Sequence, residues 1–419
     1  MTHDTSRNLT PREAANAILR KIEPLTSESL PLLDALGRVC AETVTSPIDI
    51  PAWDNSAMDG YAARSDDLRD REGVALRVVE AIAAGQFPTR TISAGQCARI
   101  FTGAPVPQGA DSVIRQEDAS VLSDGTVRID ALRDVGRNVR PRGEDITRGT
   151  TVCERGEEIG PPQIAVLAAI ATRSVQAYRV PTVAIIGSGD EIVDLDQRDA
   201  ILDGRKIASS NSYAMAAMSR AAGAVPLDLG IARDDPREVR ERLEQASTAD
   251  MIVTSGGMSV GEHDHLRTLL QDASSDMQFW RLKSRPGAPV GFGMINGTPW
   301  LGLPGNPVST MVTFELFVRP ALRKMMGHQA LFRRPTSVRL GEPISTPARL
   351  THFLRVRLTD EAGTPVAHLT GPQGSGIASS MAKADALLIV PEDVSEGSPG
   401  EAFQAMRLNE AVHVTEVPF

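Results

Sequence analysis

Two hydroxyl side chains and two carboxylates lie within one short glycine-rich stretch of the chain. The hydroxyls belong to Ser255 and Ser259, and the carboxylates to Glu262 and Asp264. Hydroxyls and backbone N–H groups suit a bound phosphate, whereas carboxylates repel it unless a hard cation such as Mg²⁺ lies between them. These residue types therefore favour a Mg²⁺-assisted phosphate site.

The elements predicted around this stretch would bring its polar groups together. The apolar run Met251 to Val253 is typical of a strand buried on both faces, and His263 to Leu270 has a helical pattern. A strand, a glycine-rich turn and a helix in that order favour bound anions, because unpaired N–H groups and the helix dipole face the ligand. The glycine spacing fits neither a dinucleotide-binding loop nor a P-loop. A turn that is glycine-rich for packing alone is the other interpretation.

Similar loops recur between residues 181 and 327, where predicted strands and helices alternate. Each predicted strand ends in a loop of Gly with Asp, Glu or hydroxyl residues, at 187–191, 230–236, 255–261 and 300–309. In an open α/β sheet, ligands bind at the carboxyl ends of the strands. Four such loops on one edge favour a binding site over packing alone.

Two helices in this region have predicted start signals. Asn211 or Ser212 would cap a helix that ends at Ala222, and Asn306 would cap a long helix that ends near Met326. Both helices would begin at the edge where the glycine-rich loops lie.

The first part of the chain has a different pattern. Thr10 to Glu13 is a capping box that would begin a helix, and residues 51–62 (PAWDNSAMDGYA) are too polar in the middle for a core strand and are typical of a surface turn. Short β-branched runs between residues 74 and 153 predict an inserted β module. Three arginines follow at residues 137–142, and they suit either a solvated turn or an oxyanion site.

The composition limits the class of protein. A chain of 419 residues implies two to four domains, and a formal charge of −9 argues against nucleic acid or an acidic membrane as partner. The cysteines Cys40, Cys97 and Cys153 have no metal-binding spacing and are expected as reduced thiols. The polar start is not expected to be a signal peptide, and no apolar run reaches the length of a membrane span. We therefore expect a soluble, cytoplasmic protein.

We predict a multidomain fold that combines α/β and β domains. A central α/β domain would hold a mostly parallel sheet with glycine-rich loops at the strand carboxyl ends, beside a helical N-terminal part, an inserted β module and a small C-terminal β domain. The predicted bounds are 8–50 with 146–178 for the N-terminal mixed domain, 51–145 for the inserted domain, 179–328 for the α/β domain and 329–419 for the C-terminal β domain.

These segments resemble one family, the molybdopterin molybdenumtransferases, which are related to the E domain of gephyrin. DNSAMDGYA (54–62), SGGMSVG (255–261) and GLPGNPVS (302–309) carry the resemblance most specifically, and further segments match in family order. The resemblance implies an enzyme that inserts molybdenum from molybdate into adenylated molybdopterin and releases AMP with Mg²⁺. It also implies a homodimer whose sites join the α/β domain of one subunit to the N-terminal domains of the other. Molybdopterin adenylyltransferase and molybdoenzyme chaperones are possible partners.

The resemblance also assigns roles to residues of this sequence. The implied catalytic residues are Asp59, Asp145, Glu191, Asp234 and Asp264. Mg²⁺ would be held by Glu191 and Asp264, and molybdate by Arg355 and Ser375. The residues implied to bind the adenylated pterin are Thr102, Ser188, Gly189, Asn211, Ser255, Gly256, Gly257, Ser259, Gly261, Arg281, Arg285, Pro304, Gly305 and Asn306.

The sequence departs from the family pattern at three positions. Ser188 replaces a threonine and keeps the hydroxyl, Arg281 replaces a common lysine, and Ala288 replaces a lysine of the usual K-P-G-K-P segment. Because Arg and Lys differ as point contacts, the change at Arg281 alters how phosphate would be bound.

Two other functions share the expected fold. A molybdopterin adenylyltransferase would use a similar SGG loop but leaves DNSAMDGYA and the C-terminal β domain without a role. A gephyrin-like interaction scaffold would not need acidic and hydroxyl groups at every ligand position. The molybdenum insertase is therefore the preferred interpretation.

Overall fold

The computed structural model describes residues 8–69, 71–122, 124–233, 235–256 and 277–409. The chain divides into two compact units. The large unit comprises the residues up to Glu28 and those from Tyr178 onward, and the small unit comprises Ser29–Ala177. The strands β2 (Ser27–Pro31) and β13 (Ser174–Tyr178), where the chain passes from one unit to the other, pair with each other.

A mixed seven-stranded sheet forms the centre of the large unit. Its strands are β1 (Asn8–Leu9), β14 (Thr182–Ser188), β17 (Val225–Ala232), β18 (Met251–Ser255), β19 (Gln278–Leu282), β21 (Pro289–Ile295) and β22 (Thr298–Leu303). Their order is β1-β19-β21-β22-β18-β14-β17. The strands β22, β18, β14 and β17 run parallel, whereas β21 is antiparallel to both neighbours. The carboxyl ends of β14, β18 and β22 therefore meet at one edge.

The sequence of β18 explains its central position. Met251 and Val253 pack into one hydrophobic cluster and Ile252 packs into another, on the opposite face of the sheet. Every residue of β18 is buried. The prediction of a strand buried on both faces is confirmed.

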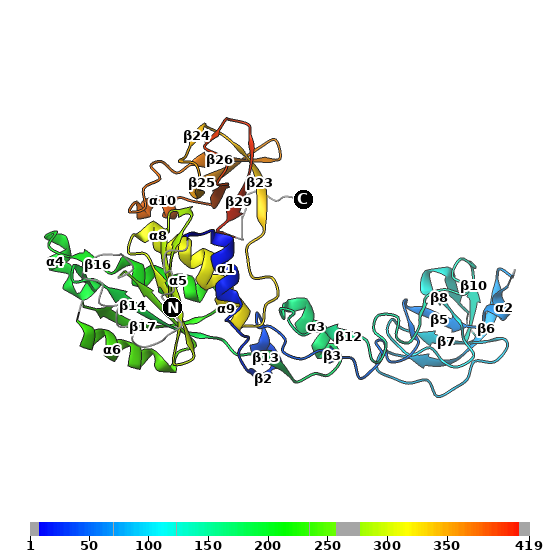
Figure 1. Ribbon diagram of the computed structural model, residues 1–419. Helices are drawn as coiled ribbons and strands as arrows, with labels where there is room; N and C mark the ends of the chain where they lie inside the picture. Colours follow the sequence, from blue (N-terminus) through cyan, green and yellow to red (C-terminus); the bar gives the residue numbers. More distant parts are fainter. Residues whose placement is uncertain (1–7, 70, 123, 234, 257–276, 410–419) are drawn as a thin grey trace. The chain divides into compact units, whose positions relative to one another are not determined.

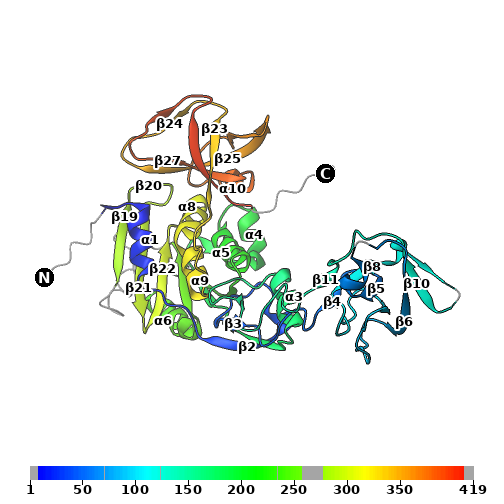
Figure 2. The ribbon, with the colours of Figure 1, turned by 90° about the vertical axis from the view of Figure 1, so that its right-hand side faces the viewer.

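Helices cover both faces of this sheet. These are α1 (Pro11–Leu19), α5 (Ser210–Ala221), α6 (Pro236–Gln245), α8 (Pro307–Thr313) and α9 (Arg319–Met325), whereas the short helix α4 (Arg198–Leu202) has no buried residue. Figure 1 shows α5 and α6 on opposite sides of β14 and β17, and Figure 2 shows α1, α5, α8 and α9 together on one side.

The first helix packs into the core of the large unit. Thr10 and Glu13 form the predicted capping box, and Ile18 and Ile22 are fully buried in the same cluster as Phe314. Strand β1 pairs with β19 in the large sheet. The residues 8–28, which the sequence assigns to the N-terminal domain, thus contribute to the α/β core.

The two predicted site helices differ in how they begin. Helix α5 begins at Ser210, with Ser209 at the N-cap position, so the prediction of Asn211 or Ser212 as the cap is wrong. Asn306 is the N-cap residue of α8, as predicted. A five-residue π-helical turn, Phe314–Val318, joins α8 to α9 and makes one continuous helix.

The C-terminal part of the large unit is a small β domain, as predicted. Its strands are β20 (Ser284–Arg285), β23 (Pro335–Leu340), β25 (Thr351–Glu361), β26 (Thr364–Leu369), β27 (Ala386–Val390) and β29 (Ala402–Arg407). Since β25 pairs with both β26 and β27, five of these strands close on themselves. Helix α10 (Ala378–Ala382) lies between β26 and β27 in the chain. Phe353 of β25 packs with Val308 and Val312 of α8, which fixes this domain on the α/β part.

The small unit contains a six-stranded sheet with the order β8-β5-β7-β6-β10-β9. The strands are β5 (Gly60–Ala63), β6 (Val74–Ile82), β7 (Gln96–Ile100), β8 (Ser112–Arg115), β9 (Ala119–Val121) and β10 (Thr126–Ile129). Residues Tyr61, Ala62 and Ala63 are at most 6% exposed. The interpretation of residues 51–62 as a surface turn is therefore wrong for its end, because Gly60 and the residues after it form an inner strand.

The rest of the small unit consists of short elements around a separate cluster. Its elements are the 3₁₀ turn Leu32–Ala35 and β3 (Val44–Thr45), β4 (Asn55–Ser56), β11 (Val139–Arg140), β12 (Thr151–Cys153) and α3 (Pro161–Ala169). Cys40 and Cys153 are buried as free thiols in this cluster.

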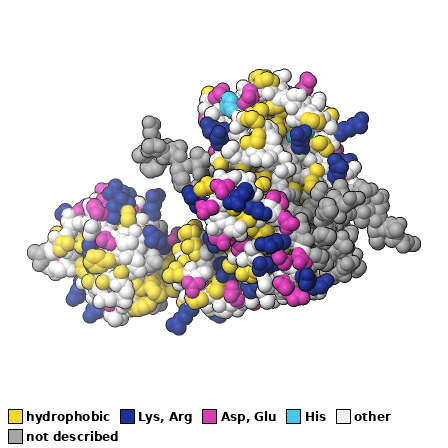
Figure 3. All heavy atoms as spheres, turned by 90° about the vertical axis from the view of Figure 1, so that its left-hand side faces the viewer, with side chains coloured by type: hydrophobic (Ala, Val, Ile, Leu, Met, Phe, Trp, Pro, Cys, Tyr) yellow, Lys and Arg dark blue, Asp and Glu magenta, His cyan; other side chains and the backbone are white. Residues whose placement is uncertain are grey.

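The surface carries charged side chains of both signs. Basic and acidic side chains are interspersed on the face shown in Figure 3. Within the part of the chain that the structure describes, none of the helices has both the length and the apolar composition that a membrane crossing needs.

Gly60 has a packing role that can be tested. A β-carbon at this position would overlap the backbone oxygen of Ile114 in β8. We expect Gly60→Ala to lower the free energy of unfolding by about 3 kcal/mol, because strand backbones cannot move apart without losing their hydrogen bonds. Gly37→Ala is the control, since Gly37 has a φ of +74° and open space around it, so only a backbone cost of about 1–2 kcal/mol applies. Equal losses in chemical denaturation would contradict this role.

Candidate functional site

The amide of Asn211 connects three elements at the carboxyl edge of the large sheet. Its Nδ2 atom lies 2.8 Å from the Oγ of Ser255, at the end of β18, and 2.7 Å from the carbonyl oxygen of Gly305, after β22. Asn211 itself lies in the first turn of α5. Because one planar amide donates both hydrogen bonds, it fixes the two loops relative to the start of the helix.

Gly256 brings a third loop to the same point. Its φ is +94°, and its N–H donates to the carbonyl oxygen of Leu303 at 3.2 Å. A β-carbon at Gly256 would lie 2.7 Å from the carbonyl oxygen of Ser188, at the end of β14. Only glycine fits both the conformation and the space. The predicted convergence of the loops after β14, β18 and β22 is thus present in the structure.

The start of α5 provides donors for an anion at this edge. Ser209 makes no side-chain hydrogen bond to the backbone N–H groups of the first turn; its hydroxyl donates instead to the Oγ of Ser212 at 2.8 Å. The N–H groups of a helix's first turn have no partner within the helix. They carry the positive end of the helix dipole, so this edge suits phosphate oxygens.

Glu191 supplies an exposed carboxylate beside Ser188 and Gly189. Gly189 has a φ of +134°, and a β-carbon there would lie 2.8 Å from Oε2 of Glu191, so the carboxylate lies over the backbone of this loop. Carboxylate oxygens are suitable ligands for Mg²⁺.

Arg281 and Arg285 lie farther along the same edge. Arg281 is an exposed residue of β19, whose direction is the same as that of β22, with β21 between them. Neighbouring strands are about 4.8 Å apart, so Arg281 is roughly 10 Å from β22. Arg285 is exposed in β20, next to the C-terminal β domain. The backbone of each arginine is too far away to contact the loops after β18 and β22, so any contact with them has to be made by the end of the side chain.

Arg355 has a buried guanidinium that no carboxylate of the described residues neutralises. The residue is 1% exposed; its Nε donates to the Oγ of Ser380 and one Nη donates to the carbonyl oxygen of Gly374, both at 3.1 Å. Burial lowers the pKa of Arg355 to about 10, so it remains charged at neutral pH. A buried cation held only by neutral groups is stabilised by a bound anion.

Ser375 connects this cation with the Pro304–Asn306 loop. It directly follows Gly374, and its carbonyl oxygen accepts a hydrogen bond from the N–H of Val308 at 3.0 Å. Val308 lies in the first turn of α8, after the Pro304–Asn306 loop. The carbonyl of Pro304 is held in turn by the hydroxyl of Thr310 at 2.6 Å. The predicted molybdate residues and the predicted phosphate residues therefore belong to one continuous region of the large unit.

In the small unit, Asp59 and Thr102 form a hydrogen-bonded pair. The backbone N–H and the hydroxyl of Thr102 both donate to Oδ1 of Asp59 at 2.8 Å. These hydrogen bonds, the backbone one first, hold the pKa of Asp59 below its ordinary value. The carboxylate is therefore ionised at neutral pH.

The arginine-rich turn of the small unit is partly used by the fold itself. Arg142 forms an ion pair with Asp49 at 2.6 Å, and its N–H donates to Oδ1 of Asp54 at 2.7 Å. Asp145 is exposed, and its N–H donates to the carbonyl oxygen of Ile50. Its carboxylate is thus accessible, whereas the guanidinium of Arg142 already has a carboxylate partner.

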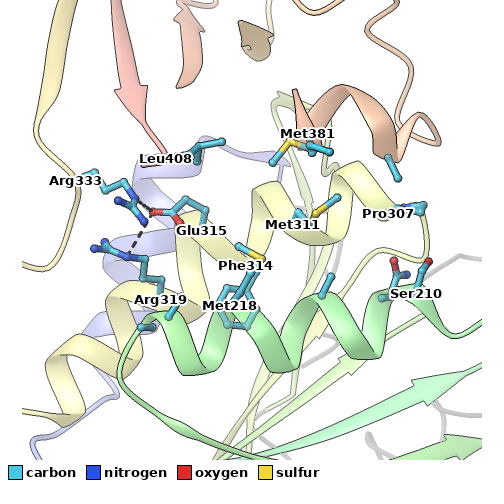
Figure 4. A pocket seen from close by; sticks show the side chains of 16 residues that line it. Ser210, Met218, Pro307, Met311, Phe314, Glu315, Arg319, Arg333, Met381 and Leu408 are labelled. Atoms are coloured by element: carbon cyan, nitrogen blue, oxygen red, sulfur yellow. Dashed lines mark hydrogen bonds and ion pairs between the residues drawn. The ribbon is translucent and has the colours of Figure 1, made fainter. Parts of the chain in front are cut away.

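An apolar groove of about 440 Å³ begins at Asn211. It lies between α5 on one side and α8 with the π turn on the other, with Met381 of α10 and Leu408 above it (Figure 4). Glu315, Arg319 and Arg333 lie at the end opposite Ser210 and Pro307. No sequence pattern predicts this groove, because its lining residues come from separate helices.

Several predicted site residues lie outside the described residues. These are Asp234, Gly257, Ser259, Gly261 and Asp264. Among the residues that the structure does describe, no group of three or more His, Cys, Asp or Glu side chains could hold a metal ion.

Comparisons with known proteins match three regions that together cover most of the chain. Residues 9–171 match the MoeA N-terminal region (domain I and II), residues 184–324 match a probable molybdopterin binding domain, and residues 337–408 match the MoeA C-terminal region (domain IV). A molybdopterin biosynthesis MoeA protein from Pyrococcus horikoshii has a similar structure, with a TM-score of 0.83 and 30% identity over 97% of this chain and all of that one.

Two bacterial relatives cover nearly the full length. The molybdopterin molybdenumtransferase of Haemophilus influenzae is 32% identical over 94% of this chain and 97% of its own length. Molybdopterin molybdenumtransferase 2 of Mycobacterium tuberculosis is 35% identical over 93% and 96% of the two chains. The chain belongs to the molybdopterin molybdenumtransferase family, a family of enzymes. The multidomain fold and the family resemblance predicted from the sequence are confirmed.

The role of Asn211 as a connector can be tested by its removal. We expect Asn211→Ala to lower the free energy of unfolding by about 1–3 kcal/mol, because Ser255 and the carbonyl of Gly305 lose a donor. Pyrophosphate binding, measured by calorimetry, should weaken as the loops separate. Arg220→Ala is the control, since Arg220 is exposed in the last turn of the same helix. Unchanged stability and binding in Asn211→Ala would show that the loops are held by other contacts.

Proposed function

We propose that this enzyme transfers molybdate into adenylated molybdopterin and releases AMP with the help of Mg²⁺. The observation that carries the proposal is the meeting of the loops after β14, β18 and β22 at Asn211, beside the uncapped start of α5. A pyrophosphate placed there meets N–H donors and the positive end of a helix dipole. These groups stabilise the negative charge that develops on phosphate oxygens during cleavage.

The molybdate would bind at Arg355 and Ser375. Molybdate is a tetrahedral dianion, and guanidinium and hydroxyl groups suit its oxygens as they suit those of sulfate. The charge of Arg355, held only by neutral partners, supports this assignment. Because Ser375 bonds to the start of α8, the dianion would lie close to the pterin's phosphates.

Mg²⁺ fits the residue types at this edge. Glu191 offers carboxylate oxygens at the end of β14, and the family resemblance adds Asp264, which lies outside the described residues. When bound, the ion would supply Lewis-acid stabilisation of the pyrophosphate. Glu191 would hold and orient it there.

The protein would be a cytoplasmic homodimer, and each subunit would have four domains. It would interact with the adenylyltransferase that makes the substrate or with molybdoenzyme chaperones, and it would have no nucleic-acid partner. Asp59, Thr102 and Asp145 would act on the substrate from the small unit, as the family resemblance implies.

Loss of Arg355 should affect molybdate more than nucleotide. We expect Arg355→Met to raise the molybdate concentration for half-maximal AMP release roughly 10- to 150-fold, because one charge-assisted hydrogen bond contributes about 1.5–3 kcal/mol. Arg357→Met is the matched control, since Arg357 is exposed two residues along the same strand. An equal effect of both substitutions on the molybdate requirement would exclude Arg355 as a molybdate ligand.

A mixing experiment tests whether two subunits share each site. Asp59→Ala and Glu191→Ala dimers should each be inactive if the two residues serve one site. After joint unfolding and refolding in equal amounts, roughly half of the dimers should be mixed. If a site takes Asp59 from one subunit and Glu191 from the other, each mixed dimer keeps one intact site. AMP release should then recover to about a quarter of the wild-type value. No recovery despite confirmed mixed dimers would show that each site uses one subunit only.

A further inference from the structure

We propose that Arg99 of β7 is a positioning residue, which holds Asp59 and Thr102 in the arrangement that the reaction needs. The inference rests on the proposed function, because it takes Asp59 and Thr102 to act on the substrate from the small unit. It adds a residue that would act on the reaction through these two side chains.

Three strands of the six-stranded sheet bring the segments around Asp59 to one edge. Strand β5 runs antiparallel to both β7 and β8, so it begins where the other two end. Asp59 directly precedes β5, Thr102 lies just after β7, and Gln116 directly follows β8. The N–H of Gln116 donates to the carbonyl oxygen of Asp59 at 3.0 Å. The place of the Asp59 carboxylate therefore depends on all three segments.

The guanidinium of Arg99 bonds to two of these segments. One Nη donates to Oε1 of Gln116 at 2.6 Å, and the other donates to the carbonyl oxygen of Gly60 at 3.4 Å. Gly60 is the residue after Asp59, and Gln116 bonds to the backbone of Asp59. Because a guanidinium is a rigid planar fork, its two Nη groups fix both partners relative to β7.

Two aromatic rings hold the guanidinium in its turn. The central carbon of the Arg99 guanidinium lies 5.0 Å from the ring centre of Tyr61 and 5.0 Å from that of Phe101. Tyr61 lies opposite Arg99 in β5, and Phe101 is the residue before Thr102. Since a cation is attracted to the face of an aromatic ring, these contacts connect Arg99 with the Thr102 segment as well.

The positive charge of Arg99 also acts on Asp59. The hydrogen bonds from Thr102, the backbone one first, hold the pKa of Asp59 below its ordinary value, and the charge of Arg99 acts in the same direction. A side chain that only packed between two rings would need neither the charge nor the two donors. Together these contacts fit a residue that orients a carboxylate and keeps it ionised.

Removal of the guanidinium should lower turnover without changing the molybdate requirement. Methionine at position 99 keeps an apolar chain between the rings and removes the donors and the charge. We expect Arg99→Met to lower kcat for AMP release roughly 10- to 100-fold, because small displacements of reacting groups have effects of this size. The molybdate concentration for half-maximal release should stay at the wild-type value. Arg77→Met is the matched control, since Arg77 is exposed in the neighbouring strand β6.

A second variant and a second measurement protect the test against misfolding. Gln116→Ala removes the acceptor of Arg99 and keeps the backbone N–H that donates to Asp59, so it should lower kcat several-fold in the same way. Hydrogen–deuterium exchange of the full chain should become at least threefold faster at Thr102 in Arg99→Met, and stay at the wild-type rate in β10. Unchanged kcat in both variants would overturn the proposal, and so would equally faster exchange at Thr102 and in β10.

The two measurements distinguish this inference from the proposed function. If the wild-type enzyme releases AMP and Arg99→Met does so at the same rate, the positioning role fails and the proposed function stands. If molybdate causes no AMP release by the wild-type enzyme, the proposed function fails and the exchange alone decides on Arg99. Faster exchange confined to the Thr102 segment would then support its positioning role, and unchanged exchange would overturn it.

Discussion

The amide of Asn211 is the contact on which the geometry of the site depends. Parallel strands bring the loops after β14, β18 and β22 to one edge, but a shared edge alone does not set the distances between loops. One side chain from α5 donates to Ser255 and to the carbonyl of Gly305, and Gly256 then packs on the backbone of Ser188 without a side chain between them. The site thus needs an amide that bonds across two strands and a glycine that no other residue can replace.

The charged groups of the large unit differ in their exposure. The carboxylate of Glu191 is exposed, whereas the guanidinium of Arg355 is buried among neutral partners. A buried charge costs free energy when it has no counter-ion, and a fold retains such a group where a ligand completes the pairing. Ser380 of α10 and Gly374, which lies in the segment before that helix, accept hydrogen bonds from the guanidinium and hold it in place.

Local sequence signals predict the helices and strands better than they predict the side-chain contacts between residues that are far apart in the chain. The apolar run Met251 to Val253 predicted a doubly buried strand because each side chain faces a core, and Asn306 before Pro307 predicted a helix start. By contrast, Ser380 contacts Arg355 across 25 residues through the closure of the β domain, and no periodicity reports such a contact. Gly60 and the residues after it were mistaken for a surface turn because their polar neighbours hid a short inner strand. The cap of α5 was misplaced because Ser209, Asn211 and Ser212 are all acceptable cap residues.

The large unit is built from two ends of the chain, with the small unit inserted at Ser29–Ala177. Strand β1 pairs with β19, and Leu25 donates its N–H to the carbonyl of Met325, so these early residues have partners that are synthesised about 300 residues later. At about 5–20 residues per second, that interval is roughly 15–60 seconds. The small unit, whose contacts lie within its own segment, can fold during this time. The apolar face of α1 therefore stays without its partners until the rest of the large unit has been synthesised.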